Sequence, residues 1–221
     1  MVKKSSILWP VIAMLGILGM FILYVWANEL RRRELTAEIS KTALVAGNLE
    51  TVVFSPKQHS EVVSRVVAQL VAHREPRNWL FLNDRELDRG LKENLGQMTW
   101  IQGLCLVRTN MTDEDLSRLT RLKKLRTLSL TETQITDAGL RHLGSLESLQ
   151  DLSISGTQVT DAGLLHLTKL TSLRSLEVSY THITEKGLIE LKKSLPEFQL
   201  DYALADIRRT NEQRRQAPSD D

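Results

Sequence analysis

The chain has 221 residues, with 29 basic and 27 acidic side chains and a formal net charge of +2 at pH 7. This balance excludes the strongly basic composition typical of nucleic-acid-binding proteins, so we expect no nucleic-acid partner. A single cysteine, Cys105, excludes an intrachain disulfide. Any folded domain in the chain must therefore be held together by its apolar core.

Residues 7–26 read ILWPVIAMLGILGMFILYVW and contain no charged side chain. At a rise of about 1.5 Å per residue, twenty helical residues span roughly 30 Å, which matches the hydrocarbon core of a bilayer. Trp9 lies near one end, and Tyr24 and Trp26 lie at the other, where an aromatic belt is expected. The segment predicts a single-pass transmembrane anchor within residues 1–27.

A signal peptide is the alternative, because Lys3 and Lys4 precede the apolar run and cleavage could follow Ala27. The run exceeds the usual signal core of about 7–15 residues, and three arginines at 31–33 follow at once, so we favour an uncleaved anchor. The basic residues nearly balance across the segment, which leaves the orientation open. The number of basic residues on each side favours a repeat domain in the cytoplasm, whereas the signal-like N terminus favours a repeat domain outside it. Of these two orientations, we expect the repeat domain to lie outside the cytoplasm.

Residues 28–97 lack the repeat described below. Residues 28–56 have spaced apolar residues among charges and predict a helical stalk or linker. Residues 57–97 are expected to form an N-terminal capping region, because QHSEVVSRVVAQLVAHR at 58–74 gathers its valines on one helical face. That face could cover the open end of the repeats, lie on a membrane or drive dimerisation. Leu80 and Leu82 lie 24 residues before Leu104 and Leu106, which suggests a degenerate first unit.

A 24-residue unit repeats four times over residues 98–193. The clearest copies, residues 122–145 and 146–169, are identical at 13 of 24 positions. Such self-similarity predicts a solenoid, in which each unit buries its apolar side against its neighbours. Each unit has an alternating Leu-x-Leu, as at Leu128 and Leu130, which is typical of a strand with one buried face. A later apolar pair three residues apart, as at Leu140 and Leu143, has helical spacing.

Two polar columns recur between the expected strand and helix. A threonine followed by an acidic residue opens each helix, at 112–113, 136–137, 160–161 and 184–185. The hydroxyl can cap the helix and the acid suits the positive end of its dipole. Calcium binding is disfavoured, since each unit supplies one acid and a calcium loop supplies several. The second column, Thr109, Thr133, Thr157 and Thr181, is expected to bond backbone groups at the corner of the coil.

The pattern Lxx-Lxx-LxL-xxT-x-I-T-D-x-G-L-xx-L, over Met98–Lys193, resembles the leucine-rich repeat. Its I-T-D-x-G-L portion is similar to the subtype of F-box-type and short bacterial repeat proteins. Threonine stands where the family often has Asn or Cys, and Asp115 replaces the glycine of the other units. The resemblance implies an α/β, right-handed solenoid used for protein recognition, with parallel strands on the concave side and helices on the convex side. No F-box-like segment is evident.

After the repeats, residues 194–206 are expected to form a C-terminal cap. LPEFQL at 195–200 resembles the closing half-repeat of the family and predicts a last strand. Residues 207–221 are polar and lack a core-forming pattern, so we expect a disordered tail.

The outward positions of the expected strands are small and rich in hydroxyl groups, and the loop edge beside them carries larger side chains. The candidate partner-binding residues are Arg108, Thr127, Ser129, Asp151, Ser153, Glu177, Ser179, Tyr180 and His182. No metal site is expected, because His142 and His166 share one position in successive units and duplication explains them. Cys105 has no partner at triad spacing, and phosphate-loop and nucleophile-elbow motifs are absent. We therefore expect no cofactor and no enzyme.

These observations predict a non-enzymatic, single-pass membrane protein that recognises a protein or an envelope polymer. Four units present only twelve outward strand residues, whereas a standard interface uses about 20–30 residues a side, so a partner must also engage the loop edge or flanks. The alternative is a structural role, in which the valine-rich helix and stalk form a homo-oligomer and the repeats are scaffold.

Overall fold

A computed structural model describes residues 43–46, 51–54, 63, 67–68 and 78–216. The predicted anchor at 7–26 and most of the valine-rich segment at 58–74 lie outside this part of the chain. No helix within the described part is long and apolar enough to cross a membrane.

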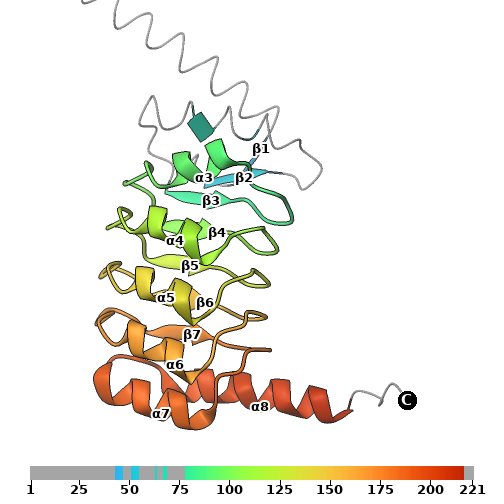
Figure 1. Cartoon of the computed structure of the whole chain (residues 1–221), viewed down its shortest axis with the longest axis vertical. Helices are drawn as coiled ribbons and strands as arrows, with labels where there is room; N and C mark the ends of the chain where they lie inside the picture. The colour runs from blue at the N-terminus through green and yellow to red at the C-terminus, as the bar shows by residue number, and fades with distance from the viewer. Residues whose placement is uncertain (1–42, 47–50, 55–62, 64–66, 69–77, 217–221) are drawn as a thin grey trace, which may run out of the picture. The chain divides into compact units, whose positions relative to one another are not determined.

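Seven strands form one sheet in chain order (Figure 1). The repeat region contributes five parallel strands of three residues each, placed one per coil and 24 residues apart: β3 (Trp79–Phe81), β4 (Gly103–Cys105), β5 (Thr127–Ser129), β6 (Asp151–Ser153) and β7 (Ser175–Glu177). Leu80 pairs with Leu104, and Leu128 pairs with Leu152, so the register repeats from coil to coil. Trp79–Phe81 is thus the strand of a further coil ahead of the four repeats.

The helices stack in a second column beside the sheet (Figure 1). They are α3 (Arg89–Leu95), α4 (Asp113–Leu119), α5 (Asp137–Leu143), α6 (Asp161–Leu164) with the 3-10 turn η1 (Leu165–Leu167), and α7 (Glu185–Ser194). The leucines at the repeat's apolar positions fill the space between the columns, where Leu128, Leu140 and Leu152 are at most 2 % exposed. This arrangement confirms the predicted α/β solenoid with parallel strands and helices.

The threonine at the corner of each coil is buried and satisfies a backbone carbonyl. The hydroxyls of Thr109, Thr133, Thr157 and Thr181 each donate to the carbonyl three residues earlier, at 2.6–2.8 Å. The corner column is therefore structural, as its sequence pattern predicted.

The aspartate that opens α4, α5 and α6 joins one coil to the next. The Asp137 carboxylate accepts from the N–H and the hydroxyl of Thr160, one coil later, at 2.8 and 2.7 Å. Asp113 and Asp161 bond the next coil's threonine in the same way. We call these the inter-coil carboxylate bonds. The acids do lie in the first helical turn, but their carboxylates bind the neighbouring coil.

These bonds explain the glycine of the I-T-D-x-G-L pattern. A Cβ added at Gly163 would lie 2.3 Å from Asp137 Oδ1, and the same approach is found at Gly139 and Gly187. Since a real Cβ does not come closer than about 3 Å to such an atom, the glycine leaves the space that the preceding coil's carboxylate occupies.

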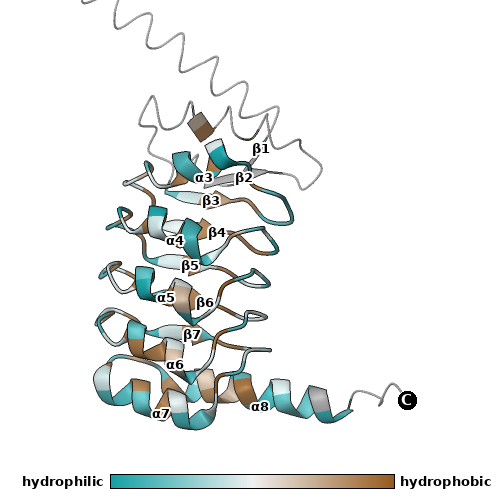
Figure 2. Cartoon of the chain, viewed as in Figure 1, coloured by the Kyte–Doolittle hydropathy of each residue, from teal (hydrophilic) through white to brown (hydrophobic). Residues whose placement is uncertain are grey.

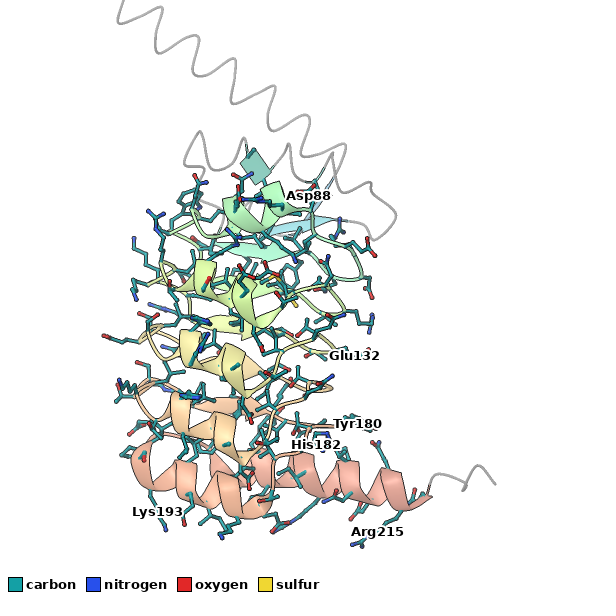
Figure 3. All side chains as sticks on the ribbon, in the orientation of Figure 1. Asp88, Glu132, Tyr180, His182, Lys193 and Arg215 are labelled. Carbon is teal, nitrogen blue, oxygen red and sulfur yellow. The ribbon has the colours of Figure 1, made fainter. Side chains whose placement is uncertain are left out.

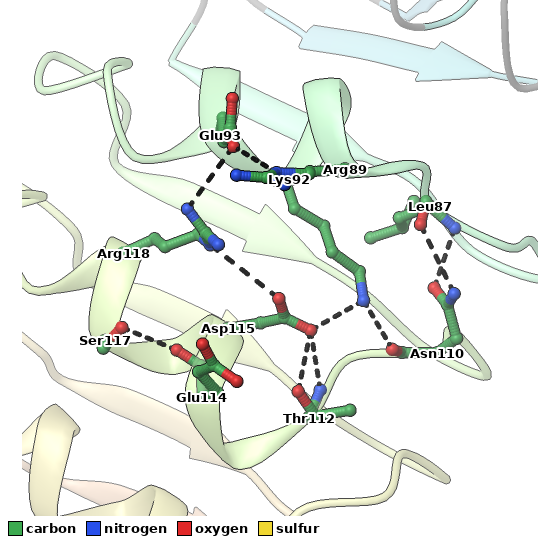
Figure 4. A network of polar contacts seen from close by, with 10 residues as sticks. All are labelled: Leu87, Arg89, Lys92, Glu93, Asn110, Thr112, Glu114, Asp115, Ser117 and Arg118. Carbon is green, nitrogen blue, oxygen red and sulfur yellow. Dashed lines mark hydrogen bonds and ion pairs between the residues drawn. The ribbon is translucent and has the colours of Figure 1, made fainter.

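The first repeat departs from this pattern in a compensated way (Figure 4). The preceding coil has Arg89 where the others have an acid, and Asp115 stands at the glycine position. The Asp115 carboxylate accepts from the N–H and hydroxyl of Thr112 in its own coil, at 3.1 and 2.9 Å. Lys92 of the preceding coil then donates to Asp115 at 2.6 Å. Burial opposes ionisation of Asp115, but the bonds from Lys92 and Thr112 outweigh it and lower the pKa of its carboxyl.

The N-terminal region differs from the expected helical stalk at 28–56. Ala43–Ala46 and Thr51–Phe54 are strands β1 and β2, which pair antiparallel, and β2 runs parallel to β3. Val45, Val52 and Val53 are β-branched, and such residues favour strands over helices. Within the expected capping region, Val63 and Val67 are fully buried.

The C-terminal region also differs from expectation. LPEFQL forms no strand, and residues 200–216 form one long helix, α8 (Leu200–Gln216), which includes most of the expected disordered tail. Its first half carries the apolar residues, as Figure 2 shows, and Ala203 and Ile207 are buried. Apolar contacts therefore hold a segment that is otherwise polar and that its composition alone marks as disordered.

Candidate partner-binding surface

The outer face of the sheet, turned away from the helix column, has a shallow depression over β5, β6 and β7. Its volume is about 170 Å³. The residues that line it are Thr127, Leu128, Ser129, Asp151, Leu152, Ser153, Ser175 and Glu177. The structure thus brings together five of the nine candidate residues, from three successive coils. We call this the sheet-face depression.

Hydroxyl groups join the coils across this face. The Thr127 hydroxyl donates to Asp151 at 3.2 Å, and the hydroxyls of Thr131 and Ser153 lie 2.8 Å apart. Asp151 and Glu177 are exposed, and the hydroxyls are half-buried. The surface therefore offers carboxylate and hydroxyl oxygens to the donors of a partner.

Helix α8 contacts the last coil on this side. Asp206 accepts from the Val178 N–H at 2.8 Å and from the Ser179 hydroxyl, and Gln213 accepts from the Tyr180 hydroxyl. The Tyr202 hydroxyl donates to Glu177 at 3.1 Å, and this bond and the carboxylate charge raise the pKa of Tyr202. Three candidate residues, Glu177, Ser179 and Tyr180, are thus bonded within the chain.

Asp206 takes the place of a further strand. In the preceding coil the Ile154 N–H donates to the carbonyl of Glu177 at 3.0 Å, and the equivalent Val178 N–H donates to the Asp206 carboxylate. An exposed strand edge is prone to pairing with another chain. Helix α8 therefore closes the C-terminal edge of the sheet.

The loop edge beside the sheet carries a second column of side chains at one repeated position. Its residues are 24 apart and all have a left-handed backbone, with φ between 51° and 69°: Asp84, Arg108, Glu132, Gly156 and Tyr180. We call this the loop-edge column. Only one of the five is a glycine, although this conformation costs a residue with a side chain roughly 1–2 kcal/mol.

Charges alternate along the upper part of this column. The Arg108 guanidinium bonds Asp84 and lies 3.6 Å from a Glu132 carboxylate oxygen. The hydrogen bond to Asp84 raises the pKa of Arg108. Exposed ion pairs of this kind add little to stability. At the lower end Tyr180 is 52 % exposed, and Figure 3 shows Glu132, Tyr180 and His182 on the same edge.

The candidate residues therefore fall into two groups and one remaining residue. Thr127, Ser129, Asp151, Ser153 and Glu177 line the sheet-face depression, and Arg108, Tyr180 and His182 lie on the loop edge. The remaining residue, Ser179, donates its hydroxyl to Asp206 of α8. Sequence reasoning placed Glu132 on the loop edge with Arg108 and Tyr180 but missed Asp84, although its 24-residue spacing from Arg108 is visible in the sequence. It also missed Tyr202 and Asp206, for which no repeat pattern gives a signal.

A larger depression, of about 440 Å³, lies on the helix side between α6 and α7. Leu165, which is 68 % exposed, lines this depression. It is the first residue of η1, directly after the end of α6. Cys105 lies on β4, half-buried and outside both depressions. In the described part of the chain no group of three or more His, Cys, Asp or Glu is placed to hold a metal ion.

The stacked coils and their polar sheet face define a leucine-rich-repeat solenoid. A family model described as Leucine Rich repeat matches residues 121–144, 145–167 and 169–192. The leucine-rich repeats that the sequence pattern predicted are thus confirmed over these residues. No curated protein matches the sequence at a significant level.

Two solved structures are similar to part of this chain. The chain is 22 % identical to an internalin C2 from Listeria monocytogenes, with a TM-score of 0.48, and the match covers 68 % of this chain and 62 % of that one. It is 18 % identical to a second internalin (inlF) from the same organism, with a TM-score of 0.45, covering 72 % of this chain and 56 % of that one. The chain thus spans less than two thirds of either internalin.

Proposed function

We propose that this chain is a membrane-anchored, non-enzymatic recognition protein whose leucine-rich repeats bind a protein partner. The observation that carries the proposal is the sheet-face depression, which gathers exposed carboxylates and half-buried hydroxyls from three coils over a core that does not need them. An envelope polymer with hydrogen-bond donors is a further ligand that the same chemistry would suit.

The contrast between the two faces of the sheet supports this proposal. The inward column is leucine in every coil from β3 to β7, whereas the outward positions change: Gly103, Thr127, Asp151 and Ser175 stand at one of them. A position that serves only packing would stay aliphatic across copies of a unit, as the buried Leu130, Ile154 and Val178 do. The outer face therefore has the freedom to specify a ligand, as binding surfaces on repeat scaffolds do.

Interface size sets a further condition. A standard interface buries about 800 Å² on each side, more than one depression of eight lining residues supplies. The partner must also contact the loop edge, where Tyr180 and His182 are exposed. Aromatic residues are common anchors of binding energy, so this edge complements the polar sheet face.

A matched pair of substitutions tests the surface. Ser153 lies in the sheet-face depression and Ser117 lies on the exposed side of α4. The full chain is tagged, cross-linked to its partner in its own host and purified. The Ser117→Arg variant is expected to recover the same cross-linked partner protein as the natural sequence does. Ser153→Arg is expected to lower recovery by about tenfold or more. Equal recovery with both variants would show that the sheet-face depression is not the binding surface.

The membrane anchor is proposed from residues 7–26, and the repeat domain is proposed to lie outside the cytoplasm. Protease added to intact cells tests this, with the mass of the chain read on the same blot. Digestion of the repeats is the expected result. Protection until lysis would place them in the cytoplasm, and a chain shortened by about 27 residues would identify a cleaved signal peptide.

Self-assembly through the valine-rich segment is the second function that the sequence suggested. Val63 and Val67 are fully buried within a single chain, so they are not exposed to a second copy. Their burial supports the capping interpretation. Polar substitution of both is expected to unfold the repeats, whereas loss of an oligomer with an intact fold would favour assembly.

A further inference from the structure

The helix side of the solenoid exposes large aliphatic side chains in its last two coils. Of the described residues of this kind, Leu165 and Ile189 are exposed, at 68 % and 46 %. They stand at one repeat position, where the two preceding coils carry Ser117 and Arg141. A coil therefore folds with a polar residue at this position, and the core does not require Leu165. One exposed leucine needs no explanation by itself, so its surroundings decide what it does.

Leu165 lines the depression of about 440 Å³ between α6 and α7, which we call the helix-side depression. Ala162, three residues before Leu165, also lines it, and its side chain is a single methyl group. At a rise of about 1.5 Å per residue, the projecting leucine and the small alanine lie roughly 4.5 Å apart along one segment. A projection and a gap at this spacing allow two facing helices to interlock.

The depression also has a positive and a negative end along α7. Lys186 and Glu190 line it one helical turn apart, and both are exposed. Lys186 has no bonding partner among the described residues. Lys193 bonds Glu190 at one carboxylate oxygen, at 2.7 Å, and leaves the other oxygen open. Each end can therefore accept an opposite charge from outside the chain.

Helices α6 and α7 lie side by side in successive coils, which fixes how these features line up. Asp161 in the first turn of α6 bonds Thr184, directly before α7, and a Cβ added at Gly187 would lie 2.1 Å from its Oδ1. The first turns of the two helices are thus adjacent. The lysine of the depression is therefore level with the alanine, and the glutamate is level with the leucine.

A single rotation satisfies both pairs at once. A twofold axis that lies in the interface and crosses α7 midway between Lys186 and Glu190 sets α7 antiparallel to α7 of a second copy. Lys186 of each copy then faces Glu190 of the other. The same rotation places each Leu165 over Ala162 of the other copy, because it exchanges the two levels. A twofold interface requires such a self-complementary patch.

We infer that the helix-side depression is a self-association surface, through which two copies of this chain pair α7 against α7. The second copy is the occupant because the patch complements itself in both shape and charge. Its ten lining residues are about half of the 20–30 that a standard interface takes from each side. We therefore expect weak pairing, with a dissociation constant on the order of 10–100 µM. The pair presents two sheet-face depressions to a multivalent partner.

Sedimentation velocity of the full chain in detergent micelles tests the inference. The natural chain should be monomeric near about 1 µM and largely dimeric near about 200 µM. Leu165→Arg introduces the residue that α5 already carries at this position, so the fold should persist and pairing should weaken by about tenfold or more. Ser117→Arg changes the same repeat position on α4, outside the depression, and should pair like the natural chain. Thermal unfolding of every variant checks the fold.

An exchange of charges is the sharper measurement. Lys186→Glu makes both ends of the depression negative, and Glu190→Lys makes both positive. Each variant alone should pair at least about fivefold more weakly at low salt, because like charges then face each other. An equimolar mixture should regain the association of the natural chain, since each negative copy can face a positive one. This recovery depends on the twofold arrangement and would not follow from pairing through another surface.

Three results would each overturn the inference. They are a natural chain that stays monomeric at about 200 µM, a dimer that Leu165→Arg leaves unchanged, and a mixture of the two charge variants that associates no better than either variant alone. The second result would locate pairing elsewhere in the chain, as in the predicted anchor. None of the three bears on the proposed function, which partner recovery with Ser153→Arg tests separately.

Discussion

The inter-coil carboxylate bonds allow a quantitative test of what joins the coils. Asp137→Ala removes the carboxylate that accepts hydrogen bonds from the Thr160 N–H and hydroxyl, at 2.8 and 2.7 Å. A hydrogen bond to a charged group is worth roughly 1.5–3 kcal/mol. Because Thr160 is half-buried and water can replace part of the loss, we expect the free energy of unfolding to fall by about 2–3 kcal/mol.

Gly163→Ala should have a similar effect for a related reason. The new Cβ would lie 2.3 Å from Asp137 Oδ1, whereas ordinary contact begins near 3.4 Å. The carboxylate must move by about 1 Å and weaken the same two bonds. Alanine favours a helix over glycine by roughly 1 kcal/mol, which offsets part of this cost and leaves a net loss of about 1–2 kcal/mol.

The double variant is the decisive measurement. Once Asp137 is alanine, the nearest of the remaining contacts of a Cβ at residue 163 is Val159 Cγ1, at 3.0 Å. Gly163→Ala should then be nearly neutral, so the two substitutions should couple by about 1–2 kcal/mol in urea unfolding of the full chain. Ser117→Arg, distant from the bonds, is the additive control. Additivity within about 0.5 kcal/mol would refute the carboxylate as the reason for the glycine.

Three further predictions concern stability and assembly. Leu152→Ala, at a 2 % exposed position, should lower the free energy of unfolding by about 2–5 kcal/mol; a loss below about 0.5 kcal/mol in urea would mean that the register is wrong. Because the pKa of Asp115 is lower in the folded chain, its carboxylate stabilises the fold at pH values above the unfolded pKa of about 4, and this stabilisation is lost as the pH falls through the folded pKa. In acid unfolding, the free energy of unfolding of Asp115→Asn should therefore fall less over that pH range than that of the natural chain. Asp206→Ala should expose the Val178 edge and increase self-association in sedimentation, and an unchanged monomer would argue against α8 as the cover of the sheet edge.

The repeat itself could be predicted from sequence because one pattern recurs in register. Leu128 and Leu152 fall on paired strands, and the corner threonines bond the carbonyls that their position implied. The role of Asp137 could not be predicted from a single unit, since its partner Thr160 lies in the next one. The combination of Arg89 in one coil with Asp115 in the next was a usable signal, because both departures occur together.

The flanks were harder to predict because they lack copies for comparison. Helix α8 is held by Ala203 and Ile207 and by bonds to residues 23 to 33 positions away, such as Tyr180 with Gln213. No local periodicity reports such contacts. The candidate site was predicted in part: five residues meet in one depression, whereas the loop-edge column depends on a backbone conformation that side-chain patterns do not show.

The direction of the inter-coil carboxylate bonds has a consequence for how such chains grow. Every internal unit carries both halves of the joint, a threonine that receives the previous carboxylate and an acid that reaches the next threonine. Tandem duplication of any internal 24-residue segment would therefore yield a longer array with all its joints intact. Only the ends need special residues: Asp115 at the start, and Glu185 at the finish, which pairs with Arg208 of α8 at 3.2 Å. The number of units is thus free to change during evolution while the two terminal structures are retained.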